Sequence, residues 1–154
     1  MPLNDLLSAG RIAILSGTSD REAVIDAASR LLATPVDTDQ ILIGDSLHAR
    51  ERLASTAIGH GVAIPHGRVD FIDASRGAFL RLAQPVDFGA ADGTPVDLIL
   101  AMVVPQHSTM KHLEQLAELA EYFSDPDFRS RLRQAADADA LARCLLTAPV
   151  GAVD

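Results

Sequence analysis

The pattern of apolar and polar positions along the chain predicts alternating strands and helices. Residues 96–104 form the most continuous apolar run, which ends at Pro105. A strand that lacks polar alternation is buried on both faces, so this run predicts a central strand covered by helices. Residues 77–82 predict a second strand. Residues 62–64 predict a short buried one that Pro65 ends, because proline has no N–H to continue a ladder. Two further strands are expected, an edge strand at residues 11–15 and a short edge strand at residues 84–88.

Between these runs, apolar side chains recur at helical spacing behind capping residues. Residues 19–22 form an S-x-x-E capping box for an amphipathic helix expected at residues 20–33. Asp125 is an N-cap followed by Pro126 at the first helical position, and Asp137 caps a last helix. A short helix is expected at residues 3–8. Another is expected from about residue 37 or 38 to 51, with Ile43 and Leu47 on its inner face. A further helix is expected from 108 to about 123, and its inner face consists of Leu113, Leu116, Ala117, Ala120 and Phe123.

These elements predict an α/β (α+β) fold in one domain, a mixed β-sheet flanked by helices on both sides. The length of 154 residues is typical of one domain, and the chain contains no internal repeat, linker or low-complexity segment. We therefore expect residues 1–154 to form a single domain, with a core at about residues 3–147.

Composition excludes several classes of function. The net charge is −8 and the chain has one Tyr and no Trp, which argues against nucleic acid as a partner. No apolar run approaches the roughly 20 residues of a membrane span, and residues 1–5 do not resemble a secretion signal. The single cysteine, Cys144, rules out an internal disulfide. We expect a cytoplasmic protein without direct membrane insertion.

Residues 55–68 concentrate hydroxyl groups, glycines, a proline and two of the five histidines. His66 follows Pro65, so we expect it just beyond a strand end. Gly67 would then let the chain turn sharply into a loop at residues 68–73. An imidazole held at a rigid strand end and open to solvent is well placed for chemistry.

Among the other histidines, His48 and His107 are interpreted as surface or satisfied residues. His112 differs, because it falls in the first turns of the helix after the central strand, where ligands of α/β sheets often bind. His66 and His112 are therefore candidates for one shared site. Their spacing matches no standard zinc motif, and neither a G-x-S-x-G elbow nor an ATP-binding P-loop is present. No metal or cofactor is expected.

Several segments together resemble one protein family. They are Arg50-Glu51, residues 55–59, the sequence G-V-A-I-P-H-G at residues 61–67, residues 95–99, and His112 with Leu113 and Leu116. This set resembles the IIA domain of the fructose/mannitol class of the phosphoenolpyruvate-dependent sugar phosphotransferase system, and most of all the stand-alone nitrogen-regulatory IIA proteins. The resemblance covers about residues 3–147. Two positions depart from the pattern: Ala57 replaces a usual glycine, and His60 replaces a small polar residue such as asparagine.

The resemblance implies that Nε2 of His66 accepts a phosphoryl group from an HPr-type phosphohistidine protein, and that Arg50 and His112 complete the site. The Thr56 hydroxyl is a candidate further donor, while for Ser55 and Thr56 a structural role in a turn is equally open. Such a protein is a phosphoryl carrier rather than a free-standing turnover enzyme.

Three functions remain in competition. A nitrogen-regulatory IIA protein would bind targets such as kinases or ion transporters according to its phosphorylation state. A sugar-transport IIA component would pass the phosphoryl group to a separate IIB protein. A metal-dependent hydrolase is the third alternative. We favour the first.

Overall fold

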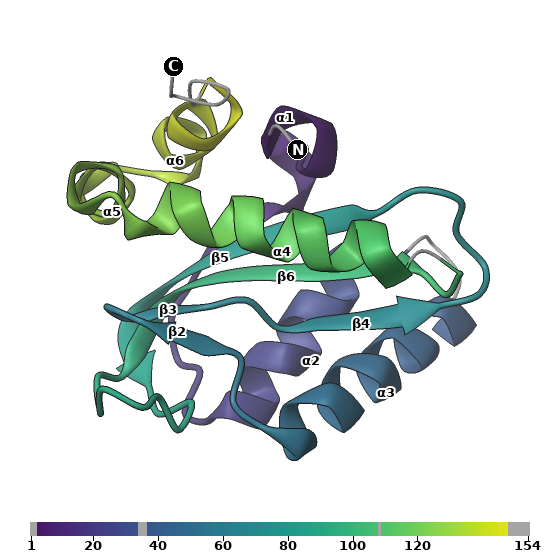
Figure 1. The fold of residues 1–154 in the computed structure, drawn as a ribbon. Coiled ribbons are helices and arrows are strands. Elements are labelled where there is room, and N and C mark those ends of the chain that lie inside the picture. Colours follow the sequence, from purple (N-terminus) through teal and green to yellow (C-terminus); the bar gives the residue numbers. More distant parts are fainter. Residues whose placement is uncertain (1–2, 34–36, 108, 148–154) are drawn as a thin grey trace.

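The structure is a computed structural model that describes residues 3–33, 37–107 and 109–147. Its centre is a six-stranded mixed sheet (Figure 1). The strands follow the order β1 (Ile12–Leu15), β5 (Arg76–Val86), β6 (Val96–Pro105), β3 (Val62–Ala63) and β2 (Ala57–Gly59), with β4 (His66–Val69) paired to β6 as well. Parallel pairs join β1 to β5, and both β3 and β4 to β6, while β5–β6 and β2–β3 are antiparallel.

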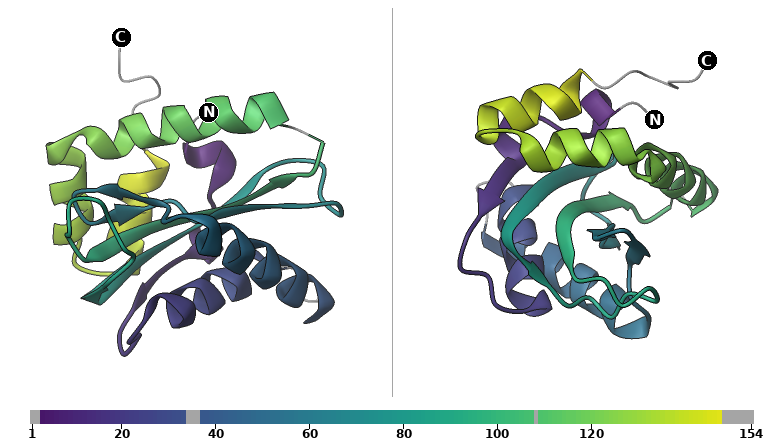
Figure 2. Two further views of the ribbon diagram at one scale, coloured as in Figure 1. Left: turned by 60° about the horizontal axis from the view of Figure 1, so that its bottom comes forward. Right: turned by 90° about the vertical axis from the view of Figure 1, so that its left-hand side faces the viewer.

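Helices cover both faces of this sheet, as Figures 1 and 2 show. One face packs against α2 (Arg21–Leu32) and α3 (Asp37–Leu53). The other packs against α1 (Leu3–Leu6), α4 (Thr109–Ser124), α5 (Pro126–Gln134) and α6 (Ala138–Leu146), and a short 3-10 turn, η1 (Ala9–Arg11), leads into β1. The predicted fold class is confirmed.

Strand β6 divides the two hydrophobic cores. Ile99 and Val103 belong to the core under α2 and α3, whereas Leu100 and Met102 belong to the core under α4 to α6. Adjacent side chains of a strand point to opposite faces, so a run of apolar residues fills both cores at once. The prediction of a central, doubly covered strand at residues 96–104 is confirmed, as is the edge position of β1.

Two predictions about the sheet were wrong, one of a strand and one of a loop. The separate edge strand expected at residues 84–88 does not form, because β5 continues through a register shift and pairs Val86 with Val96. The loop expected at residues 68–73 begins only after Val69. Pro65 has no N–H, but its carbonyl accepts a hydrogen bond from the Met102 nitrogen at 2.9 Å. The chain thus stays beside β6 and forms β4.

Two of the three predicted helix caps are confirmed, and the predicted cap of α2 is corrected. The cap of α2 is Asp20, whose Oδ1 accepts from the Ala23 nitrogen at 2.8 Å, and not Ser19. The helix begins one residue later than a Ser19 cap would require. Asp125 and Asp137 cap α5 and α6 as predicted.

The predicted inner faces are mostly confirmed. Ile43, Leu47 and Phe123 are buried, and α3 extends two residues beyond the predicted end at residue 51. In α4, Ala117 is exposed and Leu119 is buried in its place, while the side chain of Leu113 lies outside the described part of the structure. Within the described residues, no helix is long and apolar enough to cross a membrane.

Candidate functional site

His66 is the first residue of β4, where the chain resumes pairing with β6 after Ile64 and Pro65. Its Nδ1 lies 2.8 Å from the backbone oxygen of Ile64. A carbonyl oxygen only accepts hydrogen bonds, so Nδ1 carries the proton and donates it. In the neutral ring, the lone pair is then on Nε2. The strand end fixes both the tautomer and the direction of this imidazole.

The pKa of His66 lies below the ordinary value for histidine. Burial is the main cause, because the half-buried ring loses water that would solvate its charged form. The hydrogen bond to Ile64 opposes this shift, the positive charges of Arg50 and Arg68 add to it, and Glu51 opposes it. A lowered pKa favours the neutral imidazole at neutral pH.

Arg50 lies in the last turn of α3, as predicted. Its Nη1 donates to the Ala54 oxygen at 2.8 Å, which satisfies a carbonyl at the C-terminal end of the helix. Its positive charge contributes to the lowered pKa of His66, so the guanidinium lies near enough to influence the imidazole electrostatically. A guanidinium has five N–H donors, so this contact leaves capacity for anionic oxygens.

Glu51 is a buried carboxylate next to this site that the sequence analysis did not single out as functional. It is 4% exposed, and it accepts hydrogen bonds from the Thr56 nitrogen at 2.9 Å and from Thr56 Oγ1 at 2.6 Å. A hydroxyl has one hydrogen to donate, so Thr56 commits it to Glu51 in this structure. The sequence did contain one signal for Glu51, because this residue follows Arg50 directly in the segment that resembles the family.

Ser55 has a structural role. Its hydroxyl donates to the oxygen of Phe88, and the Ala57 nitrogen donates back to Ser55 Oγ at 3.1 Å. These bonds fasten the segment between α3 and β2 to the segment after β5. The bond from the Ala57 nitrogen to Ser55 Oγ is typical of a turn, and a role of Ser55 at the phosphoryl site stays a prediction.

Gly67 lies inside β4, where a sharp turn had been expected, and this expectation was wrong. Its backbone is not in the left-handed region. The glycine is required by a close approach of α3 instead. A Cβ at this position would lie 2.9 Å from the Ser46 Cβ and closer still to the Ser46 hydroxyl. Ser46 Oγ also donates to the Arg68 oxygen at 3.1 Å.

His60 forms the turn between β2 and β3 in the left-handed conformation, with φ of 59°. Its nitrogen donates to Asp92 Oδ2 at 2.9 Å, and its oxygen accepts from Arg133 Nη2 at 2.6 Å. Arg133 is paired with Asp97 at 2.9 Å, so α5 anchors this hairpin. Asparagine tolerates a left-handed backbone better than most residues, which gives a physical reason for the asparagine common here in the family.

The remaining histidines divide as follows. His112 lies in the first turns of α4 by its backbone, but its side chain lies outside the described part of the structure. Its sharing of a site with His66 stays a prediction. His48 Nε2 lies 2.8 Å from Asp26 Oδ1, and His107 is exposed in a turn, which confirms both as surface or satisfied residues. Among the residues with described side chains, no three His, Cys, Asp or Glu side chains gather as metal ligands would.

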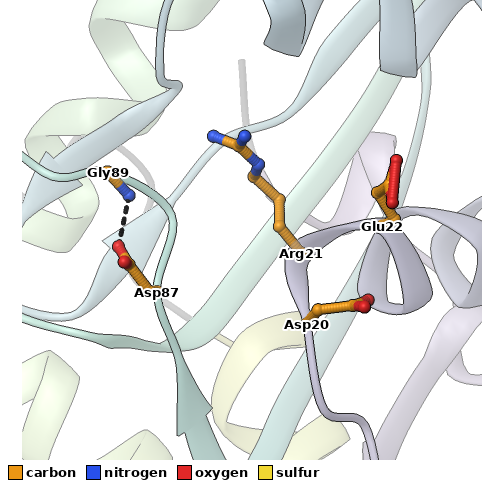
Figure 3. A pocket seen from close by; sticks show the side chains of 5 residues that line it. All are labelled: Asp20, Arg21, Glu22, Asp87 and Gly89. Atoms are coloured by element: carbon orange, nitrogen blue, oxygen red, sulfur yellow. Dashed lines mark hydrogen bonds between the residues drawn. The ribbon is translucent and has the colours of Figure 1, made fainter.

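The lining of a hollow of about 480 Å³ includes none of the predicted site residues (Figure 3). It is lined by Asp20, Arg21, Glu22, Asp87 and Gly89. The side chain of Arg21 extends from the start of α2 toward the segment of Asp87 and Gly89. Asp20 caps its helix and Asp87 accepts from the Gly89 nitrogen, so two of these carboxylates already serve the local fold.

Comparison with known proteins gives matches over most of the chain. The family model described as phosphoenolpyruvate-dependent sugar phosphotransferase system, EIIA 2, matches residues 5–147. The nitrogen regulatory protein of Pseudomonas aeruginosa is 39% identical over 140 residues, which cover 90% of this chain and 91% of that protein.

Solved structures show the same fold. The nitrogen regulatory protein IIA-Ntr of Neisseria meningitidis has a TM-score of 0.83 and 35% identity, covering 93% of this chain and 98% of that one. A complex of enzyme IIA mannitol with phosphorylated enzyme IIB mannitol from Escherichia coli contains a chain with a TM-score of 0.71 and 21% identity, covering 91% and 98%. At that identity, the second likeness concerns the fold alone.

Proposed function

Because this chain belongs to the phosphotransferase-system EIIA 2 family, we propose that it is a phosphoryl carrier whose acceptor atom is Nε2 of His66. The donor is a phosphohistidine protein of the HPr type. Family membership by itself supports a phosphocarrier or regulatory role of phosphotransferase type. The observation that carries the finer proposal is the hydrogen bond from His66 Nδ1 to the Ile64 oxygen, which places the lone pair on Nε2.

The phosphoryl transfer needs no reactant besides the donor phosphohistidine and His66. The lone pair of His66 Nε2 forms a bond to phosphorus while the nitrogen–phosphorus bond of the donor breaks, and the donor imidazole leaves with that electron pair. The His66 ring becomes positively charged because Nδ1 keeps its proton. The Ile64 oxygen then accepts from a charged donor, and such a hydrogen bond is roughly twice as strong as a neutral one.

Arg50 would bind the phosphoryl oxygens. The transition state of phosphoryl transfer is loose and spreads charge over three equatorial oxygens, so positioned cations and donors supply most of the catalysis. A planar guanidinium can donate two parallel hydrogen bonds to such oxygens. Its positive charge disfavours a protonated His66 and favours a phosphorylated one. We assign His112 as a second donor to the same oxygens.

We favour a nitrogen-regulatory role over sugar transport, because the relatives that match most of the chain at 35–39% identity are nitrogen regulatory proteins. A phosphoryl group adds about −1.5 to −2 charges and would change which surfaces fit against His66. Leu53, 82% exposed one turn from Arg50, is available to a partner that docks there. Binding to regulatory targets such as kinases or ion transporters would indicate the regulatory role. Binding to a IIB protein would indicate sugar transport.

The test is phosphorylation in a reconstituted system. Incubation with phosphoenolpyruvate, enzyme I and an HPr-type protein should add one phosphoryl group that is labile in acid and stable in base. His66→Ala should remove this label, while His107→Ala, a change in an exposed turn, should retain it. A label that persists on His66→Ala would refute the assignment. Affinity capture with the phosphorylated and unphosphorylated protein then identifies the class of partner.

A further inference from the structure

The close contact between Ser46 of α3 and Gly67 of β4 lies one helical turn from Arg50 and one residue from His66. Residues four apart are neighbours on a helix surface, so Arg50 lies one turn beyond the point where Ser46 contacts β4. At this contact the strand contributes no Cβ, so the Ser46 side chain lies against the strand backbone, and its hydroxyl donates to the backbone oxygen of the next strand residue, Arg68. The helix can approach the strand this closely only because residue 67 is a glycine.

We infer that Ser46 and Gly67 are positioning residues that hold Arg50 at its working distance from His66. The inference rests on the proposed function only in taking Arg50 and His66 as the reacting site. A side chain on Gly67 cannot be accommodated by a rotamer change alone, because it would also lie 3.0 Å from the Ser46 carbonyl carbon. The backbones of α3 and β4 would have to separate, and Arg50 would move with the helix.

Ile43 and Leu47 of α3 and Val69 of β4 share one apolar core, but the hydrogen bonds at the end of α3 do not hold Arg50 against β4. Its bond to the Ala54 oxygen is within its own helix end and moves with it. The Glu51–Thr56 bonds tie α3 to the segment that follows it and not to β4. The Ser46–Gly67 contact thus joins the element that carries the guanidinium directly to the element that carries the imidazole. Small displacements of positioning groups have large effects on transfer rates.

The test moves the glycine of this contact from the strand, at position 67, to the helix, at position 46. Gly67→Ala should weaken the electrostatic coupling of Arg50 to His66. Adding Ser46→Gly should restore most of it, because this change removes the hydroxyl and the Cβ, the two atoms nearest to the new methyl group, and leaves only the Ser46 carbonyl carbon at 3.0 Å. Gly10→Ala is the matched control, since a Cβ on that glycine meets nothing within 4 Å. Ser46→Val enlarges the helix side of the same contact and should act in the same direction as Gly67→Ala.

Coupling is measured by NMR titration of His66 with and without Arg50→Gln. In the native background, Arg50→Gln should raise the pKa of His66, and in the Gly67→Ala background this rise should shrink. Phosphoryl acceptance from an HPr-type donor should fall by roughly ten- to hundredfold in Gly67→Ala and recover in the double variant. Thermal unfolding is followed for each variant.

The outcomes separate this inference from the proposed function. A full response of the His66 pKa to Arg50→Gln in folded Gly67→Ala or Ser46→Val overturns the inference, whatever the phosphorylation result. So does a folded double variant that recovers neither measurement. If Gly67→Ala does not fold, the Ser46→Val and double variants decide the question by the same readings. A protein that shows the coupling but accepts no phosphoryl group refutes the proposed function and leaves the contact established.

Discussion

Thr56 donates two hydrogen bonds to the buried carboxylate of Glu51, one from its backbone nitrogen and one from its hydroxyl. Glu51 follows Arg50 at the end of α3, and Thr56 precedes β2, so these bonds close the segment between them. A buried charge is tolerated only when it is well hydrogen-bonded. The pair therefore stabilises the chain on which the candidate site is built.

We predict that Thr56→Val lowers the free energy of unfolding by about 1–3 kcal/mol, because it leaves the Glu51 carboxylate with one unsatisfied oxygen in the interior. Denaturant unfolding measures this change. Thr147→Val is the matched control, since the Thr147 hydroxyl bonds to a carbonyl at an exposed helix end, where water replaces the lost bond. Equal losses in the two variants would contradict the role given to the buried carboxylate.

The lowered pKa of His66 predicts a specific dependence of stability on pH. Below the ordinary value of 6.5, the unfolded chain binds a proton at this residue that the folded protein resists. The stabilising contribution is complete above that value and is lost as the pH falls through the lower folded pKa. Unfolding of the protein and of His66→Gln at pH about 7.5 and about 5 should therefore show a smaller pH dependence in the variant.

His107→Gln is the control for this measurement, because His107 is an exposed residue in a turn. Its pH dependence should match that of the unaltered protein. Phosphoryl acceptance by the unaltered protein should also decline as the pH falls through the pKa of His66, since protonation removes the lone pair on Nε2. Acceptance that increases over the same range would contradict the assigned nucleophile.

Arg50→Lys tests whether the guanidinium acts through its shape as well as its charge. Lysine keeps the positive charge but lacks the planar fork that holds two phosphoryl oxygens, so we expect transfer to slow by roughly tenfold or more. Rapid-quench measurement of phosphoryl acceptance detects this loss. Arg52→Lys, an exposed arginine in the same helical turn, should retain the native rate. A native rate in Arg50→Lys would reduce the role of Arg50 to charge alone.

His112→Ala should slow transfer to His66 without preventing the donor protein from binding. A second donor to the phosphoryl oxygens stabilises the transition state more than the docked complex. Transfer rates and the affinity for the donor are measured separately, with His107→Ala as control. An unchanged rate would remove His112 from the site.

The left-handed backbone at His60 predicts how substitutions there change the free energy of unfolding. His60→Asn should preserve or raise the free energy of unfolding, because asparagine tolerates the left-handed backbone. His60→Val should lower it by about 1–2 kcal/mol, because a β-branched residue is strained there. Denaturant unfolding compares the two variants, which both lack the imidazole. A loss with asparagine as large as with valine would contradict the view that the left-handed backbone decides the stability of this turn.

The amino-acid sequence alone determined the local elements and the candidate nucleophile. The apolar run at residues 96–104 identified the central strand, and Asp125 and Asp137 identified two helix starts, because strand periodicity and capping act between residues close in the chain. The pattern around Pro65 identified His66 and, with it, the family. These features depend on neighbours along the chain and not on its path through space.

Only the tertiary structure decided how the site is assembled. The pairing of β4 with β6, the use of Gly67 to admit Ser46, and the engagement of the Thr56 hydroxyl by Glu51 were not apparent in the sequence. The first two join residues from separate elements, and their geometry follows from strand register and from the distance between helix and strand. The third depends on the path of the chain between α3 and β2. Local composition carries no record of such distances, because they arise when the whole sheet and its helices pack together.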